Sequence, residues 1–458
     1  MLHGIPSEEL CKTFKDALTV TKALGFNYLW VDSLCIVQDD LEDWRKESAL
    51  MSKVYGNAIL NIAATHAKDG NGGLFAGRDI SFLSRQLVYL PSGEVRELLD
   101  SGLYERCLDN APLSQRAWTI QERFLAPRTC HFTTEQVFYE CNELLACEAW
   151  PRGLPNQNVQ DPGFDSERRP KFPRMVNEMS WNRIVRLYSR AKLTLSSDKL
   201  VAFSGISHHF RTVTGNEYVA GLSRHSLEQN LCWARHLRFS NPKIGAKRTP
   251  YRAPSWSWAS IDDPVRWDLY TIDDILDATE TQTVINIQSF DILPAGEDTM
   301  GGLLDAQLKT TCGPLIRSQI VSELISVHMR YSDAWAMQLH SHKSLPFSIT
   351  CGLILDREES NLLMKNLRES IFLLPVLTRR LPHNVGFSVY GLVITPALDQ
   401  GKGYFRRLGL FEFLLEESYE SLIDNLSRGT DFLMDESLYQ DAQDPGKNGI
   451  EQYTIMLV

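Results

Sequence analysis

The N-terminal part of the chain alternates between helical and strand-like spacing of its apolar side chains. Apolar residues recur every three or four positions over residues 7–24 and 41–55, which predicts two amphipathic helices. Each helix is followed by a short apolar run, at residues 28–31 and 58–64. A continuous apolar run bounded by turn residues is typical of a strand buried on both faces of a parallel sheet. The order helix, strand, helix, strand therefore predicts a parallel, βαβ-like α/β domain.

A third predicted helix, residues 116–123 (RAWTIQER), concentrates polar and aromatic groups suited to recognition. Prolines a few residues before and after it set its limits, because proline fits a first helical turn but cannot continue a helix. Trp118 and Glu122 are four residues apart and share one face of this helix, flanked by Gln121 and Arg123. This stretch is therefore the first candidate for a functional site.

Three further runs complete the N-terminal pattern. Residues 85–90 predict a strand, and residues 129–132 and 136–141 predict two strands paired through a short turn. Residues 151–173 hold several prolines, mixed charge and little periodicity, which is typical of a linker.

Beyond the predicted linker the pattern changes twice. Helical spacing predicts helices at residues 181–193, 200–210 and 226–237. Residues 252–260 (RAPSWSWAS) alternate large and small side chains, which predicts a strand with both Trp rings on one face. Two large rings of this kind can form a platform for a ligand, but burial in the core is favoured. Short apolar runs separated by turn residues then predict an antiparallel β part; they lie at residues 284–287, 313–316, 348–355, 387–394 and 406–413.

The chain is therefore expected to have four parts. The α/β domain is followed by a linker, a helical region with the Trp-rich strand, and a mainly β region, so that the C-terminal portion as a whole is α+β. Their boundaries are placed at residues 1–150, 151–175, 176–282 and 283–458.

Composition narrows the class of protein. Of the 458 residues 43% are hydrophobic and 23% are charged, which is typical of a globular chain. The net charge of −10 and the lack of a long Lys/Arg run argue against nucleic acid as a partner. No apolar run approaches the roughly 20 residues of a membrane helix, and the N-terminus does not have the pattern of a signal peptide. Nine cysteines without CxxC or zinc spacing indicate a reducing compartment, hence a cytoplasmic protein, with no metal site.

The sequence resembles the fungal heterokaryon-incompatibility domain in three motifs that occur in the family's order. These are residues 28–40 (YLWVDSLCIVQDD), residues 51–64 and residues 116–123, so that the resemblance covers roughly residues 1–145. It implies a role in self/non-self recognition and programmed cell death, with self-association or protein partners. The family is also distantly similar to Toll/interleukin-1 receptor domains, which implies a flavodoxin-like parallel sheet with flanking helices.

The same resemblance implies a reaction. Several Toll-like domains cleave NAD with one helical glutamate, and their Trp-Cys-x-x-Glu helix is similar to Trp118 and Glu122 at the same spacing. NAD is then the substrate, no further cofactor is expected, and Glu122 is the candidate catalytic residue. Family members usually open with a strand carrying an Ala-Leu-Ser-Tyr-like motif, whereas this chain begins about where that strand has ended, so an N-terminally incomplete domain is expected. Two alternatives therefore stay open: a non-catalytic interaction module, and an inactive, truncated family member.

The candidate site residues each have a functional and a structural interpretation. The Glu122 carboxylate can stabilise the positive charge that builds on ribose as an N-glycosidic bond breaks, or it can pair with a neighbouring arginine. Trp118 can stack on a ring or anchor its helix in the core. The candidate substrate contacts are Asp32, Gln38, Trp118, Gln121 and Arg123.

Asp32 and Gln38 follow the predicted strand at residues 28–31, at the edge where ligands gather in open α/β sheets. There they can hold ribose hydroxyls, or they can bond backbone groups of the loop. Asp39 or Asp40 is expected to cap the helix at residues 41–55.

Overall fold

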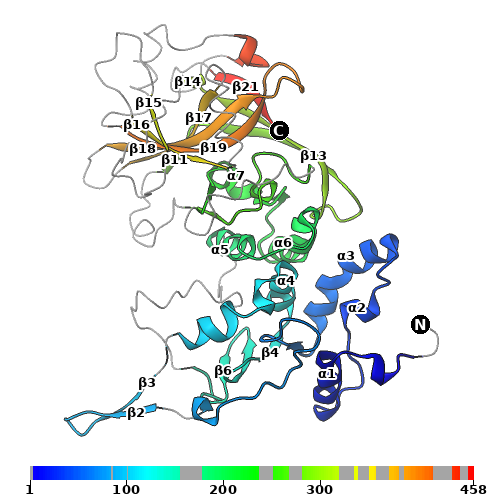
Figure 1. The fold of residues 1–458 in the computed structure, drawn as a ribbon. Helices are drawn as coiled ribbons and strands as arrows, with labels where there is room; N and C mark the ends of the chain where they lie inside the picture. The colour runs from blue at the N-terminus through cyan, green and yellow to red at the C-terminus, as the bar shows by residue number, and fades with distance from the viewer. Residues whose placement is uncertain are drawn as a thin grey trace. The chain divides into compact units, whose positions relative to one another are not determined.

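The chain forms two compact units, Met1–Val213 and Thr214–Val458, which are described separately (Figure 1). The computed structural model describes residues 4–83, 86–98, 100, 102–154, 178–236, 251–267, 281–318, 335–338, 350–356, 371–380, 386–415, 436–443 and 452–458. Most of the predicted linker lies outside these residues. The finer division of the chain into four parts stays a prediction. None of the helices in the described ranges is long and apolar enough to cross a membrane.

Unit 1 combines helices with a small mixed sheet. Its helices are α1 (Lys12–Ala23), α2 (Asp32–Cys35), α3 (Leu41–Asn57), α4 (Ala117–Leu125), α5 (Glu178–Ser189) and α6 (Val201–Thr214), which ends one residue into unit 2. Its strands are β1 (Asn61–Ala63), β2 (Gln86–Tyr89), β3 (Val95–Leu98), β4 (Arg128–Phe132), β5 (Val137–Cys141) and β6 (Leu145–Cys147). Short helical turns join them: η1 (Ser7–Glu9), η2 (Ile80–Leu83), η3 (Glu105–Asp109), η4 (Leu113–Gln115) and η6 (Ser196–Lys199).

The main sheet of unit 1 has the strand order β1-β4-β5-β6. β1 and β4 are parallel, whereas β4 pairs with β5 and β5 with β6 in the antiparallel sense. The predicted pairing of the runs at residues 129–132 and 136–141 is therefore confirmed. Unit 1 is a mixed α/β unit with a partly parallel sheet, and the flavodoxin-like order expected from the resemblance is not confirmed.

The strand predicted at residues 28–31 is wrong. This run leads into α2 without joining a sheet, and Tyr28 is 93% exposed. Among the described residues no backbone group pairs with those of Tyr28, Leu29 or Trp30. An apolar run becomes a strand only where a neighbouring strand accepts and donates its ladder hydrogen bonds, and this run has none.

The helices α3 and α4 form close to where the sequence predicted them, although each ends two residues later, at Asn57 and Leu125. The Asp40 side chain accepts hydrogen bonds from the backbone N–H groups of Glu42 and Asp43, so Asp40, not Asp39, caps α3. The first turn of α4 is held by Thr119, whose hydroxyl lies 2.7 Å from the Leu113 carbonyl oxygen. The cap of α3 could be predicted from the sequence because capping depends on residues only a few positions apart.

Unit 2 is built on one large, mainly antiparallel sheet. Its strands are β7 (Tyr218–Val219), β8 (Leu222–Ser223), β9 (Ala234–Arg235), β10 (Val265–Arg266), β11 (Thr281–Thr283), β12 (Asn286–Pro294), β13 (Leu303–Cys312), β14 (Ile316–Ser318), β15 (Trp335–Gln338), β16 (Thr350–Leu355), β17 (Ile371–Arg380), β18 (Phe387–Pro396), β19 (Tyr404–Leu415), β20 (Asp441–Gln443) and β21 (Gln452–Leu457). Its short helices are η7 (Arg224–Ser226), α7 (Leu227–Asn230), η9 (Trp258–Ser260) and η11 (Glu436–Leu438). β11 to β21 form an eleven-stranded sheet in which β19 and β21 pair in parallel, so the predicted antiparallel β part is confirmed.

Two predictions for the start of unit 2 are wrong. The helix predicted at residues 226–237 is limited to α7, because Ala234 and Arg235 pair with β10 instead. The Trp-rich run at residues 252–260 is a turn that ends in η9, not a strand. Its indole N–H groups point to different partners: that of Trp256 donates to the Leu457 carbonyl at 3.1 Å, and that of Trp258 to the Gly221 carbonyl at 2.5 Å.

Both Trp side chains are nevertheless fully buried, as expected for core residues. Through these two hydrogen bonds the motif connects β21 to the β7–β8 turn within unit 2, so its role is structural.

Candidate functional site

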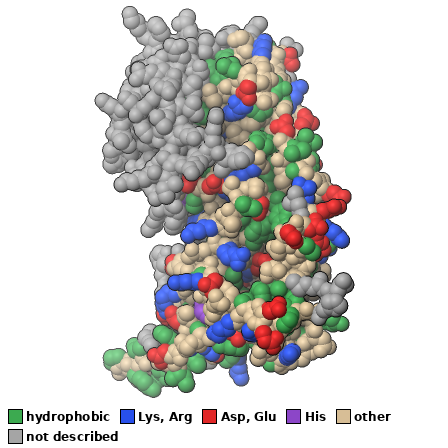
Figure 2. Space-filling view, turned by 45° about the vertical axis from the view of Figure 1, so that its right-hand side comes forward, with side chains coloured by type: hydrophobic (Ala, Val, Ile, Leu, Met, Phe, Trp, Pro, Cys, Tyr) green, Lys and Arg blue, Asp and Glu red, His purple; other side chains and the backbone are tan. Residues whose placement is uncertain are grey.

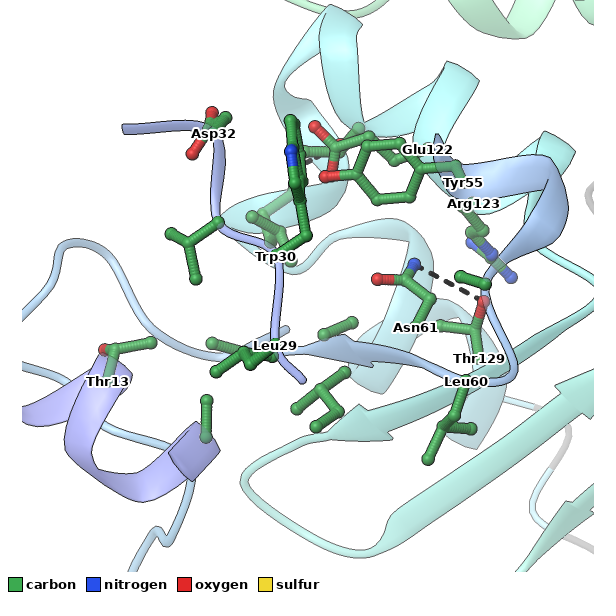
Figure 3. Close-up of a pocket in the computed structure, with 18 of the residues that line it drawn as sticks. Thr13, Leu29, Trp30, Asp32, Tyr55, Leu60, Asn61, Glu122, Arg123 and Thr129 are labelled. Carbon is green, nitrogen blue, oxygen red and sulfur yellow. Dashed lines mark hydrogen bonds between the residues drawn. The ribbon is translucent and has the colours of Figure 1, made fainter. Parts of the chain in front are cut away.

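Unit 1 contains a cavity of about 740 Å³ (Figure 3). Its walls come from α1, the segment at residues 26–33, the end of α3, β1 with the residues on either side of it, and α4. Much of the lining is apolar, and one polar wall lies where α3 and α4 meet, with further polar side chains such as Asn61 and Thr129 on β1 and β4. A concave, mainly apolar cavity with a few convergent polar groups is the form that small-molecule sites take.

Glu122 from α4 and Tyr55 from α3 meet at this polar wall (Figure 3). The Tyr55 hydroxyl and the Glu122 carboxyl group lie next to each other there. Burial raises the pKa of Glu122 to about 7 and the nearby Asp32 carboxylate adds to this rise, while Arg116 and the Tyr55 hydroxyl oppose it. Burial and the Glu122 charge also raise the pKa of Tyr55, so the phenol keeps its proton.

Asp32 and Arg116 complete this group. Asp32 is the first residue of α2 and accepts a hydrogen bond from the Ser33 N–H at 2.7 Å, which orients its carboxylate. Arg116 precedes α4 with an extended backbone and contributes its positive charge to the same wall. Two carboxyl groups in different environments, one with a pKa near neutrality, form a pattern typical of general acid–base chemistry.

A second polar network adjoins the cavity, and Thr65, Arg123 and His131 of this network are part of the cavity lining. The Arg123 guanidinium donates to both Glu140 carboxylate oxygens, at 2.7 and 3.2 Å, and to the Tyr104 hydroxyl at 2.6 Å. Glu140 also lies 3.1 Å from His131 Nε2, and His131 Nδ1 lies 3.1 Å from the Thr65 hydroxyl. Burial alone would raise the pKa of Glu140, but Arg123 and His131 hold it well below its usual range.

The predicted site residues are therefore placed in two groups. Glu122, Asp32 and Arg123 line the cavity, although the Arg123 guanidinium is held by Glu140 and Tyr104. Trp118 and Gln121 do not line it.

The three candidates outside the cavity lining have structural contacts. Trp118 packs edge-to-face on Trp44, with 6.5 Å between ring centroids. The Gln121 side-chain oxygen accepts a 2.8 Å hydrogen bond from the Gly205 N–H, which docks α6 on α4. The Gln38 amide donates to the Ile36 carbonyl within its own loop, at 3.1 Å.

Sequence reasoning missed two members of the polar wall. Tyr55 follows Met51 by four residues on α3, and this spacing places both side chains on the inward face of the helix. From the sequence, Arg116 is only one of the neighbouring arginines that can pair with Glu122. The helix spacing could have identified Tyr55, whereas nothing in the local sequence indicates that its hydroxyl meets Glu122.

Comparison with known proteins gives one result. Residues 3–122 match the family model of the heterokaryon incompatibility protein (HET). The match includes α1, α3, β1 and most of α4, and it ends at Glu122. No curated protein and no solved structure matches the chain.

Proposed function

We propose that the chain acts in heterokaryon incompatibility, with a HET domain over residues 3–122 that cleaves the N-glycosidic bond of NAD and so links self/non-self recognition to cell death. The observation that carries the proposal is the position of Glu122, at the wall of a cavity beside Tyr55, with burial raising its pKa to about 7. The family match supports the cellular role, and the cavity chemistry supports the reaction.

The proposed reaction needs a group that stabilises positive charge on the ribose. As the bond between ribose and nicotinamide breaks, the bonding electron pair leaves with nicotinamide and the ribose takes on oxocarbenium character. The ionised Glu122 carboxylate stabilises this charge across the cavity. A water molecule then adds to the same ribose carbon and gives one proton to a carboxylate, so that the products are ADP-ribose, nicotinamide and a proton.

Tyr55 and Asp32 act through Glu122 in this proposal. The Tyr55 hydroxyl orients the Glu122 carboxyl group, and burial together with the Asp32 charge keeps the pKa of that group near neutrality. Near neutral pH, Glu122 is then present in both protonation states, which suits a residue that accepts and releases a proton in one cycle.

The test is NAD consumption by the purified full chain, followed by release of nicotinamide. Glu122→Gln keeps the size of the side chain and should abolish turnover, and Tyr55→Phe should reduce it. Glu42→Gln is a matched control on the exposed start of α3 and should leave turnover unchanged. Equal turnover by wild type and Glu122→Gln would refute the catalytic role.

Expression in a fungal cell separates catalysis from assembly. Cell death that disappears with Glu122→Gln agrees with the proposed reaction. Death that persists in this variant would instead favour the non-catalytic interaction module.

A further inference from the structure

Trp30 is an aromatic side chain of the cavity lining that has no role in the reaction proposed above. It belongs to the apolar run at residues 28–31, which joins no sheet and leads into α2. Its ring meets the ring of Tyr55 at 80°, with 5.7 Å between the ring centroids. Trp30 therefore stands beside the polar wall that Tyr55 and Glu122 form, as Figure 3 shows.

At least one face of the Trp30 indole is not covered by another ring. In an edge-to-face pair Tyr55 covers one face at most, and the described residues place no second ring and no cation over Trp30. The Trp30 side chain is half-buried, and it lines the cavity. A flat group that enters the cavity can therefore stack on the indole.

The opening of the cavity is apolar at the protein surface. Leu24, Phe26 and Tyr28 line the cavity and are exposed, and Tyr28 has an exposed fraction of 93%. Figure 2 shows hydrophobic and acidic side chains next to each other on the surface of the protein. Exposed apolar side chains at the mouth of a cavity mark a ligand site, and acidic groups beside them favour a ligand with positive charge.

Asp32 gives the Trp30 ring a negatively charged neighbour. The Asp32 charge adds to the rise in pKa that burial produces at Glu122 and Tyr55, so this carboxylate lies within electrostatic reach of both groups. In the view of Figure 3, Asp32 and Tyr55 lie on opposite sides of the Trp30 ring. The face of an indole attracts cations, and a carboxylate beside it adds to that attraction.

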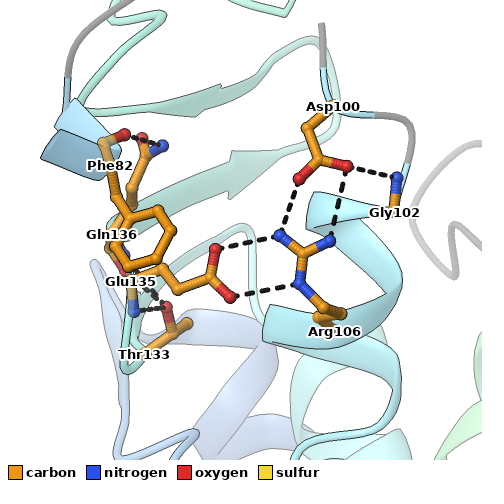
Figure 4. Close-up of polar contacts among 7 residues, drawn as sticks. All are labelled: Phe82, Asp100, Gly102, Arg106, Thr133, Glu135 and Gln136. Atoms are coloured by element: carbon orange, nitrogen blue, oxygen red, sulfur yellow. Dashed lines mark hydrogen bonds and ion pairs between the residues drawn. The ribbon is translucent and has the colours of Figure 1, made fainter.

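The Asp32 carboxylate has no cation of the protein to pair with. Elsewhere in unit 1, Asp100 and Glu135 share the Arg106 guanidinium, with N–O distances of 2.7 and 3.0 Å (Figure 4). Asp32 forms no ion pair within the part of the chain that the structure describes, and it accepts a hydrogen bond from the Ser33 backbone N–H. Its negative charge is therefore left to act on a ligand in the cavity.

We propose that Trp30 is the stacking platform for the nicotinamide ring of NAD, with Asp32 as the counter-charge. This ring is a pyridinium cation in NAD, and it becomes neutral nicotinamide when the bonding electron pair returns to its nitrogen. The platform therefore holds the charged substrate more tightly than the neutral product, and it selects the oxidised over the reduced dinucleotide. Arg116, which is exposed on the same wall, suits the negatively charged pyrophosphate. The proposal rests on the proposed function for the identity of the ligand, but not on catalysis by Glu122.

Two probes that differ mainly in charge test the platform. Nicotinamide methylated on its ring nitrogen carries the pyridinium charge, whereas nicotinamide itself is neutral, and neither has a glycosidic bond to break. In titration calorimetry at pH 8, above the pKa of Glu122, the full chain should bind the methylated form about 10-fold more tightly. Trp30→Leu should reduce this preference to about 2-fold, and Trp30→Phe should keep part of it because an aromatic ring remains.

Two charge variants separate the effect of Asp32 from a general effect of charge. Asp32→Asn should weaken the binding of methylated nicotinamide by about 3-fold, because the counter-charge is lost. Asp100→Asn removes the same charge from the Arg106 contact in Figure 4, outside the cavity lining, and should leave binding unchanged. Helical circular dichroism shows whether each variant is folded.

NAD turnover then distinguishes the platform from the reaction. In the wild-type background, Trp30→Leu should raise KM for NAD more than it lowers kcat. A wild type that binds neither probe, or both equally, would overturn the proposal, and so would a preference that survives Trp30→Leu. A wild type that prefers the methylated form through Trp30 but does not consume NAD would refute the reaction and support the platform.

Discussion

Replacing Glu122 by Gln should change the pH dependence of stability in unit 1. The pKa of Glu122 rises from 4.5 to about 7 in the folded chain, mainly because of burial. Above pH 7 the carboxylate is ionised in both the folded and unfolded states, and the folded state disfavours that charge. Since one pH unit corresponds to about 1.4 kcal/mol, the full penalty is about 3 kcal/mol, and we expect about 1–3 kcal/mol for a half-buried side chain.

The sign of the effect follows from proton binding. Below pH 4.5 Glu122 is protonated in both states and does not change the free energy of unfolding. Between pH 4.5 and 7 the unfolded chain releases this proton while the folded chain keeps it, so the wild type loses stability as the pH rises. Glutamine cannot ionise, so Glu122→Gln should gain stability relative to wild type across this window and keep the gain above pH 7.

Urea unfolding at pH 4.5, 6 and 8 tests this expectation. Helical circular dichroism reports mainly on unit 1, because nearly all of the described longer helices lie there. Glu42→Gln, at an exposed position on α3, controls for the loss of one carboxylate. A stability difference between wild type and Glu122→Gln that stays the same from pH 4.5 to pH 8 would refute the reasoning.

Three further substitutions test the structural interpretation. Glu140→Ala leaves the buried Arg123 without its carboxylate and should destabilise unit 1 by about 3–5 kcal/mol in urea unfolding. Asp40→Ala removes the cap of α3 and should cost about 1 kcal/mol in the same assay, whereas Asp39→Ala should have little effect. Trp256→Phe keeps a buried ring but loses the hydrogen bond to the last strand, and should lower the stability of unit 2 by about 1 kcal/mol, measured by thermal unfolding.

Local features of the fold could be predicted from the sequence. Helices α3 and α4 follow from their apolar spacing and from capping and proline signals within a few residues of each end. The pairing of β4 with β5 follows from two strand-like runs joined by a short turn. These elements share one property, since the groups that define them are close together in the chain.

Residues 28–31 and 252–260 show where pattern alone failed. The first run has the composition of a buried strand, yet no neighbouring strand pairs with it among the described residues. The second alternates like a strand, yet its indole N–H groups find carbonyl partners in distant segments and the chain turns between them. In both runs the deciding hydrogen bonds involve residues outside the local pattern.

For the candidate site, the sequence by itself determined that Glu122 shares a helix face with Trp118, and that Asp32 follows an apolar run. Only the tertiary structure decided that Glu122 faces Tyr55 and Asp32 in a cavity, whereas Trp118 packs on Trp44. Helix periodicity sets which side chains share a face, because it depends on neighbouring backbone geometry. Burial and the charges of distant residues set the pKa of Glu122, and these exist only once α2, α3 and α4 have packed together.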